Sequence, residues 1–326
     1  VIIGNYAYIA DGPGGLQIVD ISDSTLPEYV NKVTLPGNSY TITGTPQYLY
    51  IGDREDTLRI LSLANPTNPV QVGRLALGDD ALGAFVSENI VYVAARAQGL
   101  VIINVQNPSN PVILGIYNTS GFAYDVVVAN NLAYVADATK GVRIINVSNP
   151  ANPVETGYYD TNGITYGVSK YGDYLYAADG AVGIKVFDAS RTDTLILLGS
   201  LDTPGMAIGI QYYNNHLFVA DGAMGGLRII NVSNPSLPSE LGYILSLSTA
   251  NFVSVRNALA YLTDGSTGLL IISQNIVGTE EHSHSPLMTS LRLIPQPVRQ
   301  RNSVSIRFTI EKETEGRIEI FDVTGR

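Results

Sequence analysis

A repeat of about 42 residues runs through most of the 326-residue chain and limits the folds that the chain can adopt. Each copy carries an aromatic residue in the same local pattern: Tyr8, Tyr50, Tyr92, Tyr134, Tyr176, Phe218 and Tyr261. A turn and an aliphatic run follow the aromatic residue, as in Leu16–Asp20 and Val142–Asn146. Seven copies predict seven similar modules that bury their apolar surface against one another.

Each copy is expected to form four short β-strands. In the fourth copy these are Asp125–Ala129, Leu132–Ala136, Val142–Val147 and Val154–Tyr159, separated by residues typical of turns. The second and third strands are apolar on both faces, so neighbouring modules must cover each sheet on both sides. The sequence therefore predicts an all-β fold, a seven-bladed β-propeller over residues 1–273. An open β-solenoid is the alternative.

The third strand of each copy and the turn after it resemble a known family. Gly15–Asp23 reads Gly-Leu-Gln-Ile-Val-Asp-Ile-Ser-Asp, and Gly141–Val154 repeats the pattern with two Asn-Pro pairs. This pattern is similar to the LVIVD repeat of bacterial surface and secreted proteins, although Asp188–Arg191 of the fifth copy departs from it. The resemblance implies a propeller that is extracellular or on the outer cell surface.

The C-terminal part of the chain departs from the repeat. Residues 274–286 are polar and are expected to form a linker, and residues 287–326 alternate apolar and polar residues as strands do. Residues 287–326 resemble the C-terminal sorting domain of the type IX secretion route, a small Ig-like β-sandwich. The matching residues are Pro295–Pro297, Ser305–Phe308 and Ile318–Arg326. The resemblance implies an incomplete β-sandwich that engages the secretion machinery when complete. A plain two-stranded hairpin is the alternative.

Composition excludes several classes of function. The chain has no cysteine, and three histidines cannot build a multi-histidine metal centre. Residues 287–326 carry a net charge of +2, which leaves −12 on residues 1–286 and argues against nucleic acid and anionic membranes as partners. No apolar run approaches the roughly 18 residues of a transmembrane segment.

An acidic residue ends the second strand in six copies: Asp11, Asp53, Asp137, Asp179, Asp221 and Asp264. The third copy has Ala95 instead. Aspartate at a turn accepts hydrogen bonds from nearby backbone N–H groups, so a structural role is expected, and Asp137→Ala should cost about 0.5–2 kcal/mol. A ring of carboxylates that binds calcium is the alternative, and no other cofactor is expected.

Candidate ligand contacts come from positions where the copies differ. The first residues of the innermost strands align in two sets, one with Asn38, Asp80, Phe122, Ile164, Met206 and Thr249, the other with Tyr40, Leu82, Tyr124, Tyr166, Ile208 and Asn251. Such positions border one mouth of a propeller channel. The candidates are Tyr40, Asp79, Asp80, Tyr124, Asp125 and Tyr166. The tyrosines would alternatively pack between blades, and the acids would face water.

The predicted function is an interaction module that binds protein or glycan through one propeller face. No nucleophile lies in a pattern with a base, so no catalytic residue is assigned. The alternative is a propeller hydrolase or lyase that uses carboxylates at the channel mouth together with a metal ion. Acids that converge from several blades at that mouth would favour the enzyme.

Ring closure is expected to be irregular. Val1 aligns with Val127, so the first copy begins inside an innermost strand, and a polar segment at 281–286 stands where the seventh copy should have its outer strand. Blade seven is therefore expected to have three strands of its own, with its outer edge unpaired or covered by the C-terminal segment. In a longer protein, residues before Val1 are expected to supply that outer strand.

Overall fold

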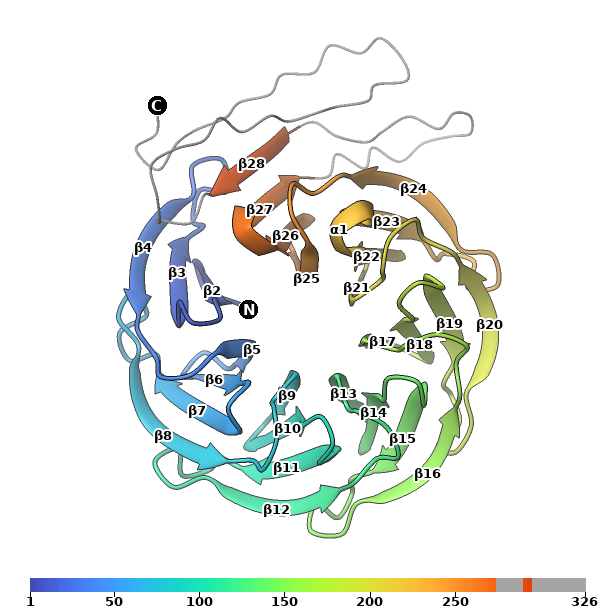
Figure 1. Cartoon of the computed structure of the whole chain (residues 1–326), viewed down its shortest axis with the longest axis horizontal. Helices are drawn as coiled ribbons and strands as arrows, with labels where there is room; N and C mark the ends of the chain where they lie inside the picture. Colours follow the sequence, from blue (N-terminus) through green and yellow to red (C-terminus); the bar gives the residue numbers. More distant parts are fainter. Residues whose placement is uncertain (274–289, 295–326) are drawn as a thin grey trace.

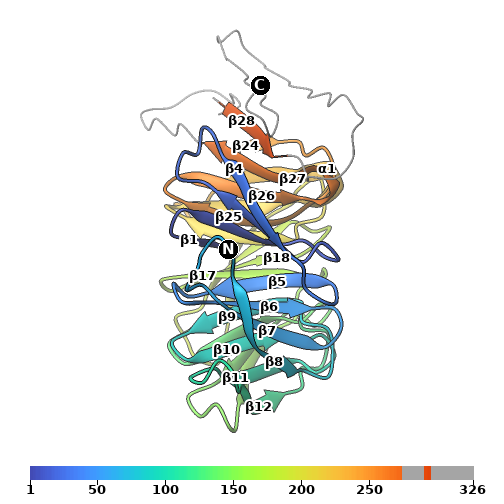
Figure 2. The same cartoon turned by 90° about the vertical axis from the view of Figure 1, so that its left-hand side faces the viewer.

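The computed structural model describes residues 1–273 and 290–294, which form seven four-stranded antiparallel sheets around one axis (Figure 1). Seen from the side, the ring is a flat disc (Figure 2). The innermost strands are β1 (Ile2–Ile3), β5 (Ser39–Gly44), β9 (Gly83–Ser87), β13 (Asp125–Ala129), β17 (Gly167–Tyr171), β21 (Gly209–Tyr213) and β25 (Ala250–Arg256). The second strands are β2 (Tyr6–Ala10), β6 (Tyr48–Asp53), β10 (Ile90–Ala94), β14 (Leu132–Ala136), β18 (Tyr174–Ala178), β22 (His216–Ala220) and β26 (Leu259–Asp264).

The two outer positions of each blade complete the sheets. The third strands are β3 (Leu16–Asp20), β7 (Thr57–Ser62), β11 (Leu100–Asn104), β15 (Val142–Asn146), β19 (Ile184–Asp188), β23 (Leu227–Asn231) and β27 (Gly268–Ser273). The outer strands are β4 (Glu28–Val33), β8 (Val70–Ala76), β12 (Val112–Tyr117), β16 (Val154–Tyr159), β20 (Ile196–Leu201), β24 (Ser239–Ile244) and β28 (Ser290–Ile294).

Hydrophobic clusters between neighbouring blades close the ring. Tyr134, which is 2% exposed, packs with Phe187 of the next blade in one of these clusters. Another cluster joins Ala7 of the first blade to Tyr261 of the last. The predicted seven-bladed propeller is therefore confirmed, and the open solenoid is wrong.

Blade seven takes its outer strand from beyond the repeat. β28 pairs antiparallel with β27, with Ser290 opposite Ser273 and Ile294 opposite Leu269. This agrees with the expectation that the C-terminal segment covers the edge, and it places residues 290–294 of the predicted sorting segment in the propeller. The predicted linker at 274–286 and the sorting motifs in 295–326 lie outside the described residues.

Two short helical turns, which were not expected from the sequence pattern, interrupt the otherwise all-β fold. α1 (Gly222–Gly225) follows β22, and η1, a 3₁₀ turn at Gly265–Thr267, follows β26. The loop of blade six is one residue longer than in the other copies, and Gly225 N donates to Asp221 O to close one helical turn. The longest helix in the described part of the chain, α1, has four residues, which is too short to span a membrane.

Candidate functional site

The loops that enter each innermost strand lie on one face of the ring, which we call the loop face. Five isolated β-bridges join the entry of an innermost strand to the loop after the second strand of the preceding blade, as between Ala138 and Thr165 and between Gly180 and Ala207. The backbone of this face is therefore ordered from blade to blade. The two aligned sets of variable residues lie on this face, at or just before the start of the innermost strands.

Three large apolar side chains are exposed at equivalent positions of blades four, five and six. Phe122 is 48% exposed, Ile164 39% and Met206 43%. We call these three residues the apolar arc. Met224 of α1, in the loop after the second strand of blade six, is 74% exposed. These side chains remain exposed to solvent in the folded chain, so the arc is available to a binding partner.

The same position is polar in blades two, three and seven, where it holds Asn38, Asp80 and Thr249. Asp80 forms an ion pair with Arg96 at 3.3 Å. At this position the loop face is thus apolar in blades four to six and polar or charged in blades two, three and seven.

The predicted tyrosines lie in edge-to-face pairs at the mouth. The ring centroids of Tyr124 and Tyr166 are 4.9 Å apart, and those of Tyr40 and Phe252 are 5.7 Å apart. The Arg54 guanidinium lies 4.1 Å from the centroid of Tyr40. Burial, followed by the neighbouring Tyr124, raises the pKa of Tyr166. The tyrosines therefore pack across blade boundaries while they remain half-exposed.

Asp125 begins β13 and joins two blades. One carboxylate oxygen accepts from Val126 N at 2.9 Å and the other from Val168 N of the next blade at 3.0 Å. Burial raises the pKa of Asp125 to about 6, although both backbone hydrogen bonds act to lower it. Both oxygens already have backbone donors, so the geometry favours a structural role over ligand contact.

Asp79 and Asp80 lie in the loop that enters blade three, next to Asp56. Carboxylate oxygens of these three residues lie within 4.8 Å of one another. In the described part of the chain, these are the acidic residues that lie close enough together to bind one cation. Asp79 also accepts from Ala97 N at 3.0 Å and lies 3.9 Å from the Arg96 guanidinium. Arg96 thus already balances part of this charge, and the three acids alone identify no metal.

The turn acids are far more buried than the sequence suggests. Five of them have no solvent exposure: Asp53, Asp137, Asp179, Asp221 and Asp264. Four of these form ion pairs with a base in the third strand of the same blade: Asp53 with Arg59 at 3.0 Å, Asp137 with Arg143 at 3.5 Å, Asp179 with Lys185 at 3.3 Å and Asp221 with Arg228 at 3.5 Å.

Blade one replaces the ion pair by a hydrogen bond from Gln17 Nε2 to Asp11 at 2.8 Å. Blade three has Ala95 and Val101 at the two positions, so the acid and the base are absent together. Because each base balances its acid within one blade, these contacts favour the structural role over a calcium ring. The base that follows the acid after six residues, or after seven in blade six, is a signal in the sequence that predicts this pairing and was missed.

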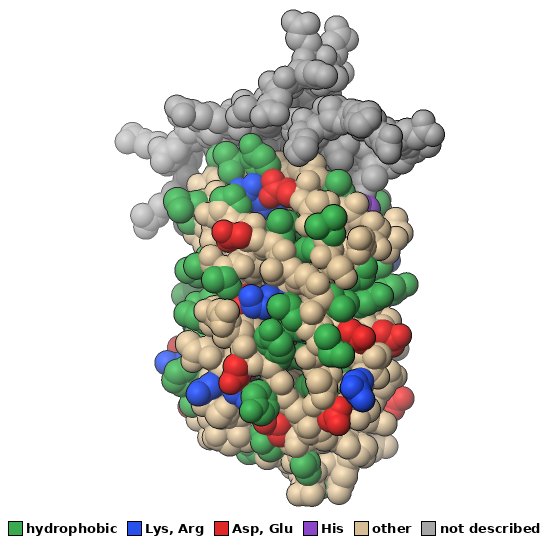
Figure 3. Space-filling model, turned by 90° about the vertical axis from the view of Figure 1, so that its right-hand side faces the viewer, with side chains coloured by type: hydrophobic (Ala, Val, Ile, Leu, Met, Phe, Trp, Pro, Cys, Tyr) green, Lys and Arg blue, Asp and Glu red, His purple; other side chains and the backbone are tan. Residues whose placement is uncertain are grey.

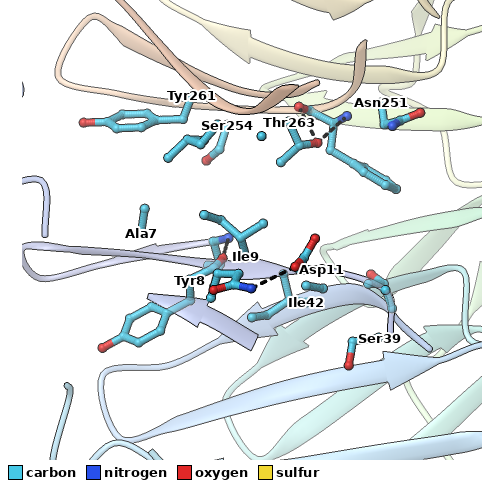
Figure 4. Close-up of a pocket in the computed structure, with 18 of the residues that line it drawn as sticks. Ala7, Tyr8, Ile9, Asp11, Ser39, Ile42, Asn251, Ser254, Tyr261 and Thr263 are labelled. Carbon is cyan, nitrogen blue, oxygen red and sulfur yellow. Dashed lines mark hydrogen bonds between the residues drawn. The ribbon is translucent and has the colours of Figure 1, made fainter. Parts of the chain in front are cut away.

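A pocket of about 650 Å³ lies between blade seven and the first two blades. Figure 4 shows Ser254, Thr263 and Asn251 on one side of it, facing Ile9 and Asp11 on the other. Tyr40, Phe252 and Arg54 also line it. The pocket therefore reaches the polar side of the channel mouth, a feature that the sequence did not predict.

Known structures share this architecture at low sequence identity. A periplasmic gluconolactonase of Pseudomonas aeruginosa aligns with a TM-score of 0.71 at 12% identity, over 90% of this chain and 99% of that one. A Lactobacillus plantarum protein aligns with a TM-score of 0.72 at 13% identity, over 89% and 98%. A Desulfotomaculum acetoxidans protein of unknown function aligns with a TM-score of 0.69 at 13% identity, over 85% and 94%. These similarities establish the fold alone.

Comparison at the level of sequence families is more specific. A search of curated proteins finds no match. The family model of the LVIVD repeat matches six consecutive segments: residues 1–34, 37–76, 79–119, 120–161, 162–203 and 204–245. These segments cover well over half of the chain and correspond to blades one to six, so the protein belongs to the LVIVD repeat family.

Proposed function

We propose that this protein is an interaction module that binds a protein partner through the loop face. The observation that carries the proposal is the apolar arc of Phe122, Ile164 and Met206, which are exposed at the same position of three consecutive blades. Exposed apolar side chains that gather at one place and are bordered by polar groups are typical of protein-binding surfaces. The ion pair of Asp80 with Arg96 supplies part of that polar border.

The outer rim of the ring offers a comparison. Val112, Val154 and Ile196 are also exposed at one repeated position, by 51%, 50% and 45%. They begin the outer strands of successive blades, which lie at the circumference of the ring (Figure 1), whereas each arc residue lies three residues before an innermost strand. On the side of the rim seen in Figure 3, hydrophobic side chains are interspersed with polar and charged ones.

The experiment starts from peptides selected for binding to the whole chain from a random displayed library. Their affinity is then measured for a triple variant of the arc, F122S/I164S/M206S, and for a rim variant, V112S/V154S/I196S. We expect the arc variant to lose at least tenfold in affinity and the rim variant to bind like the wild type. Equal affinity for all three proteins, or a loss in the rim variant alone, would refute the proposal. Thermal melts check that both variants fold.

The hydrogen bonds and ion pairs of the acidic residues at the channel mouth support an interaction module better than they support a hydrolase or lyase. Asp125 accepts two backbone hydrogen bonds, and Asp79 and Asp80 lie beside Arg96. The likeness to a gluconolactonase rests on 12% identity and carries the fold but not the reaction.

The proposed location is outside the cytoplasm, on the bacterial cell surface or secreted. The support is the family resemblance together with the similarity of residues 287–326 to a type IX sorting domain. Protease added to intact cells of the source bacterium should digest the protein if it is at the surface, and the protein should be in the culture medium if it is released. Protection until the cells are lysed would contradict the proposal.

A further inference from the structure

The turns that join the innermost strands to the second strands lie on the face of the ring opposite the loop face. We call this the hairpin face. In blades three to six, the residues that end the innermost strands at this face are Ser87, Ala129, Tyr171 and Tyr213. Tyr171 of blade five is 58% exposed. The repeat therefore tolerates small side chains at this position, where blade five presents an exposed aromatic ring.

Tyr171 stacks on the neighbouring blade. Its ring centroid lies 4.3 Å from that of Tyr212 in β21, with 16° between the ring planes. Tyr212 also stacks with buried Tyr176 at 5.4 Å and 13°, and its hydroxyl donates to Asn215 Oδ1 at 3.0 Å. Tyr212 is thus held from two sides and covers one face of the Tyr171 ring. Because the Tyr171 side chain remains largely exposed, the other ring face is open to solvent.

Two polar side chains lie in register with this ring across blade five. Tyr171 pairs with Tyr174 in β18, and Tyr174 pairs with Asp188 in β19. Residues directly opposite one another on antiparallel strands point to the same side of the sheet, with Cβ atoms about 5 Å apart. The three side chains therefore form a row, which we call the tyrosine row. Asp188 is also the first residue of the segment in which the fifth copy departs from the LVIVD pattern.

The polar groups of the row suit a ligand that donates hydrogen bonds. Asp188 Oδ1 accepts from Ser190 N at 2.9 Å, and hydrogen bonds from the Ser190 side chain and backbone lower the pKa of Asp188. The carboxylate is therefore ionised at neutral pH, and its two oxygens can accept further hydrogen bonds. Tyr174 is 37% exposed, so its hydroxyl can also accept or donate. Asp173, in the adjoining turn, is exposed and adds a second negative charge.

We propose that the tyrosine row of Tyr171, Tyr174 and Asp188 is a binding site for a neutral pyranose sugar. One face of a pyranose presents C–H groups that stack on the open face of the Tyr171 ring, and hydroxyl groups at its edge donate to Asp188. The negative charge of the row repels acidic sugars. A protein partner would need a broader apolar surface than one ring. The site lies on the face opposite the apolar arc, so the inference does not rest on the proposed function.

The probes are three neutral oligosaccharides, cellohexaose, mannohexaose and xylohexaose, and one acidic oligosaccharide, hexagalacturonic acid. Binding to the whole chain is measured by isothermal titration calorimetry. We expect saturable binding of at least one neutral probe and none of the acidic probe. Saturation-transfer NMR should then show transfer from tyrosine ring protons to the C–H protons of one sugar face. No binding of any neutral probe, equal binding of the acidic probe, or binding of a hexa-arginine peptide alone would overturn the proposal.

Variants of the protein locate the site. Tyr171→Ala removes the stacking surface and should weaken sugar binding at least tenfold, whereas Tyr171→Phe keeps the ring and should bind like the wild type. Asp188→Asn keeps an acceptor for Ser190 but loses the charge, and should weaken binding at least threefold.

Tyr158→Ala is the matched control, because Tyr158 is also 58% exposed but lies on the outer strand β16. It should bind sugar normally, and thermal melts check that every variant folds. Unchanged binding by Tyr171→Ala, or an equal loss in Tyr158→Ala, would overturn the assignment to the tyrosine row. The arc variant F122S/I164S/M206S should bind sugar like the wild type, so the failure of this inference and the failure of the proposed function are distinguishable.

Discussion

At the scale of single residues, the acidic residue that ends the second strand is part of a buried charged pair in four blades. Asp137 has no solvent exposure and accepts from Thr119 Oγ1 at 2.6 Å and Gly121 N at 2.9 Å in the loop that enters its blade. Burial raises the pKa of Asp137, although these hydrogen bonds and Arg143 act to lower it. Asp137 thus stabilises the loop that connects two blades, whereas a turn cap would stabilise only its own turn.

The pairing predicts a larger loss than the 0.5–2 kcal/mol expected for a cap. Asp137→Ala removes the buried carboxylate from Arg143, Thr119 and Gly121, and should cost about 3–5 kcal/mol in the free energy of unfolding although Asp160 still accepts from Arg143 at 3.0 Å. D137A/R143V reproduces Ala95 and Val101 of blade three and should be less destabilised than the sum of the two single variants. Urea unfolding of the three variants measures the coupling. Additive losses would show that the acid and the base act independently.

Asp125 predicts a pH dependence of stability. Its pKa in the folded chain is about 6, above the ordinary 3.8, so the folded chain binds a proton more tightly than the unfolded chain. The free energy of unfolding should therefore decrease as pH rises from about 4 to about 6. Asp125→Asn should remove this part of the slope in urea unfolding measured at pH 4, 5, 6 and 7. An unchanged slope would contradict the raised pKa.

At the scale of strands, exposed sheet edges are covered in two ways. Along the channel, a polar side chain of one blade accepts from a backbone N–H of the next innermost strand: Asp125 from Val168, Ser169 from Tyr212 and Gln211 from Val255. At the rim of blade seven, β28 covers β27. Both arrangements remove the open edges through which sheets associate.

The strand β28 can be tested by truncation. A chain that ends at residue 286 lacks β28, so its melting temperature should be lower by at least about 4 °C and it should self-associate through the edge of β27. A chain that ends at residue 294 keeps β28 and is the control, expected to match the full chain in both respects. Thermal melts measure the melting temperatures of the truncated chains, and size-exclusion chromatography measures their self-association. Identical behaviour of the two truncated chains would show that β28 does not stabilise the ring.

Strand positions were well predicted because turn residues separate them locally. The expected strands Asp125–Ala129 and Leu132–Ala136 agree with β13 and β14 at both ends. The strand β28 could not be assigned to blade seven, because residues 290–294 lie outside the repeat and only tertiary pairing places them there.

At the scale of the whole molecule, the ring is closed by equivalent clusters but its mouth is not symmetric. Aligning the copies predicted which residues are equivalent in successive blades, because every blade has the same order of strands. It could not predict that Tyr124 packs against Tyr166 or that Asp125 bonds to Val168, since those contacts join residues about 42 positions apart. The apolar arc on blades four to six follows from differences that the repeat does not constrain.

The central claim is that a partner binds the arc on the loop face. Hydrogen–deuterium exchange of the whole chain, with and without a peptide selected from the displayed library, tests it most directly. We predict slower exchange in residues 118–124, 160–166 and 202–208, which hold Phe122, Ile164 and Met206, and no change in the outer strands β12, β16 and β20. Protection of those outer strands with unchanged exchange in the three loops would contradict the claim.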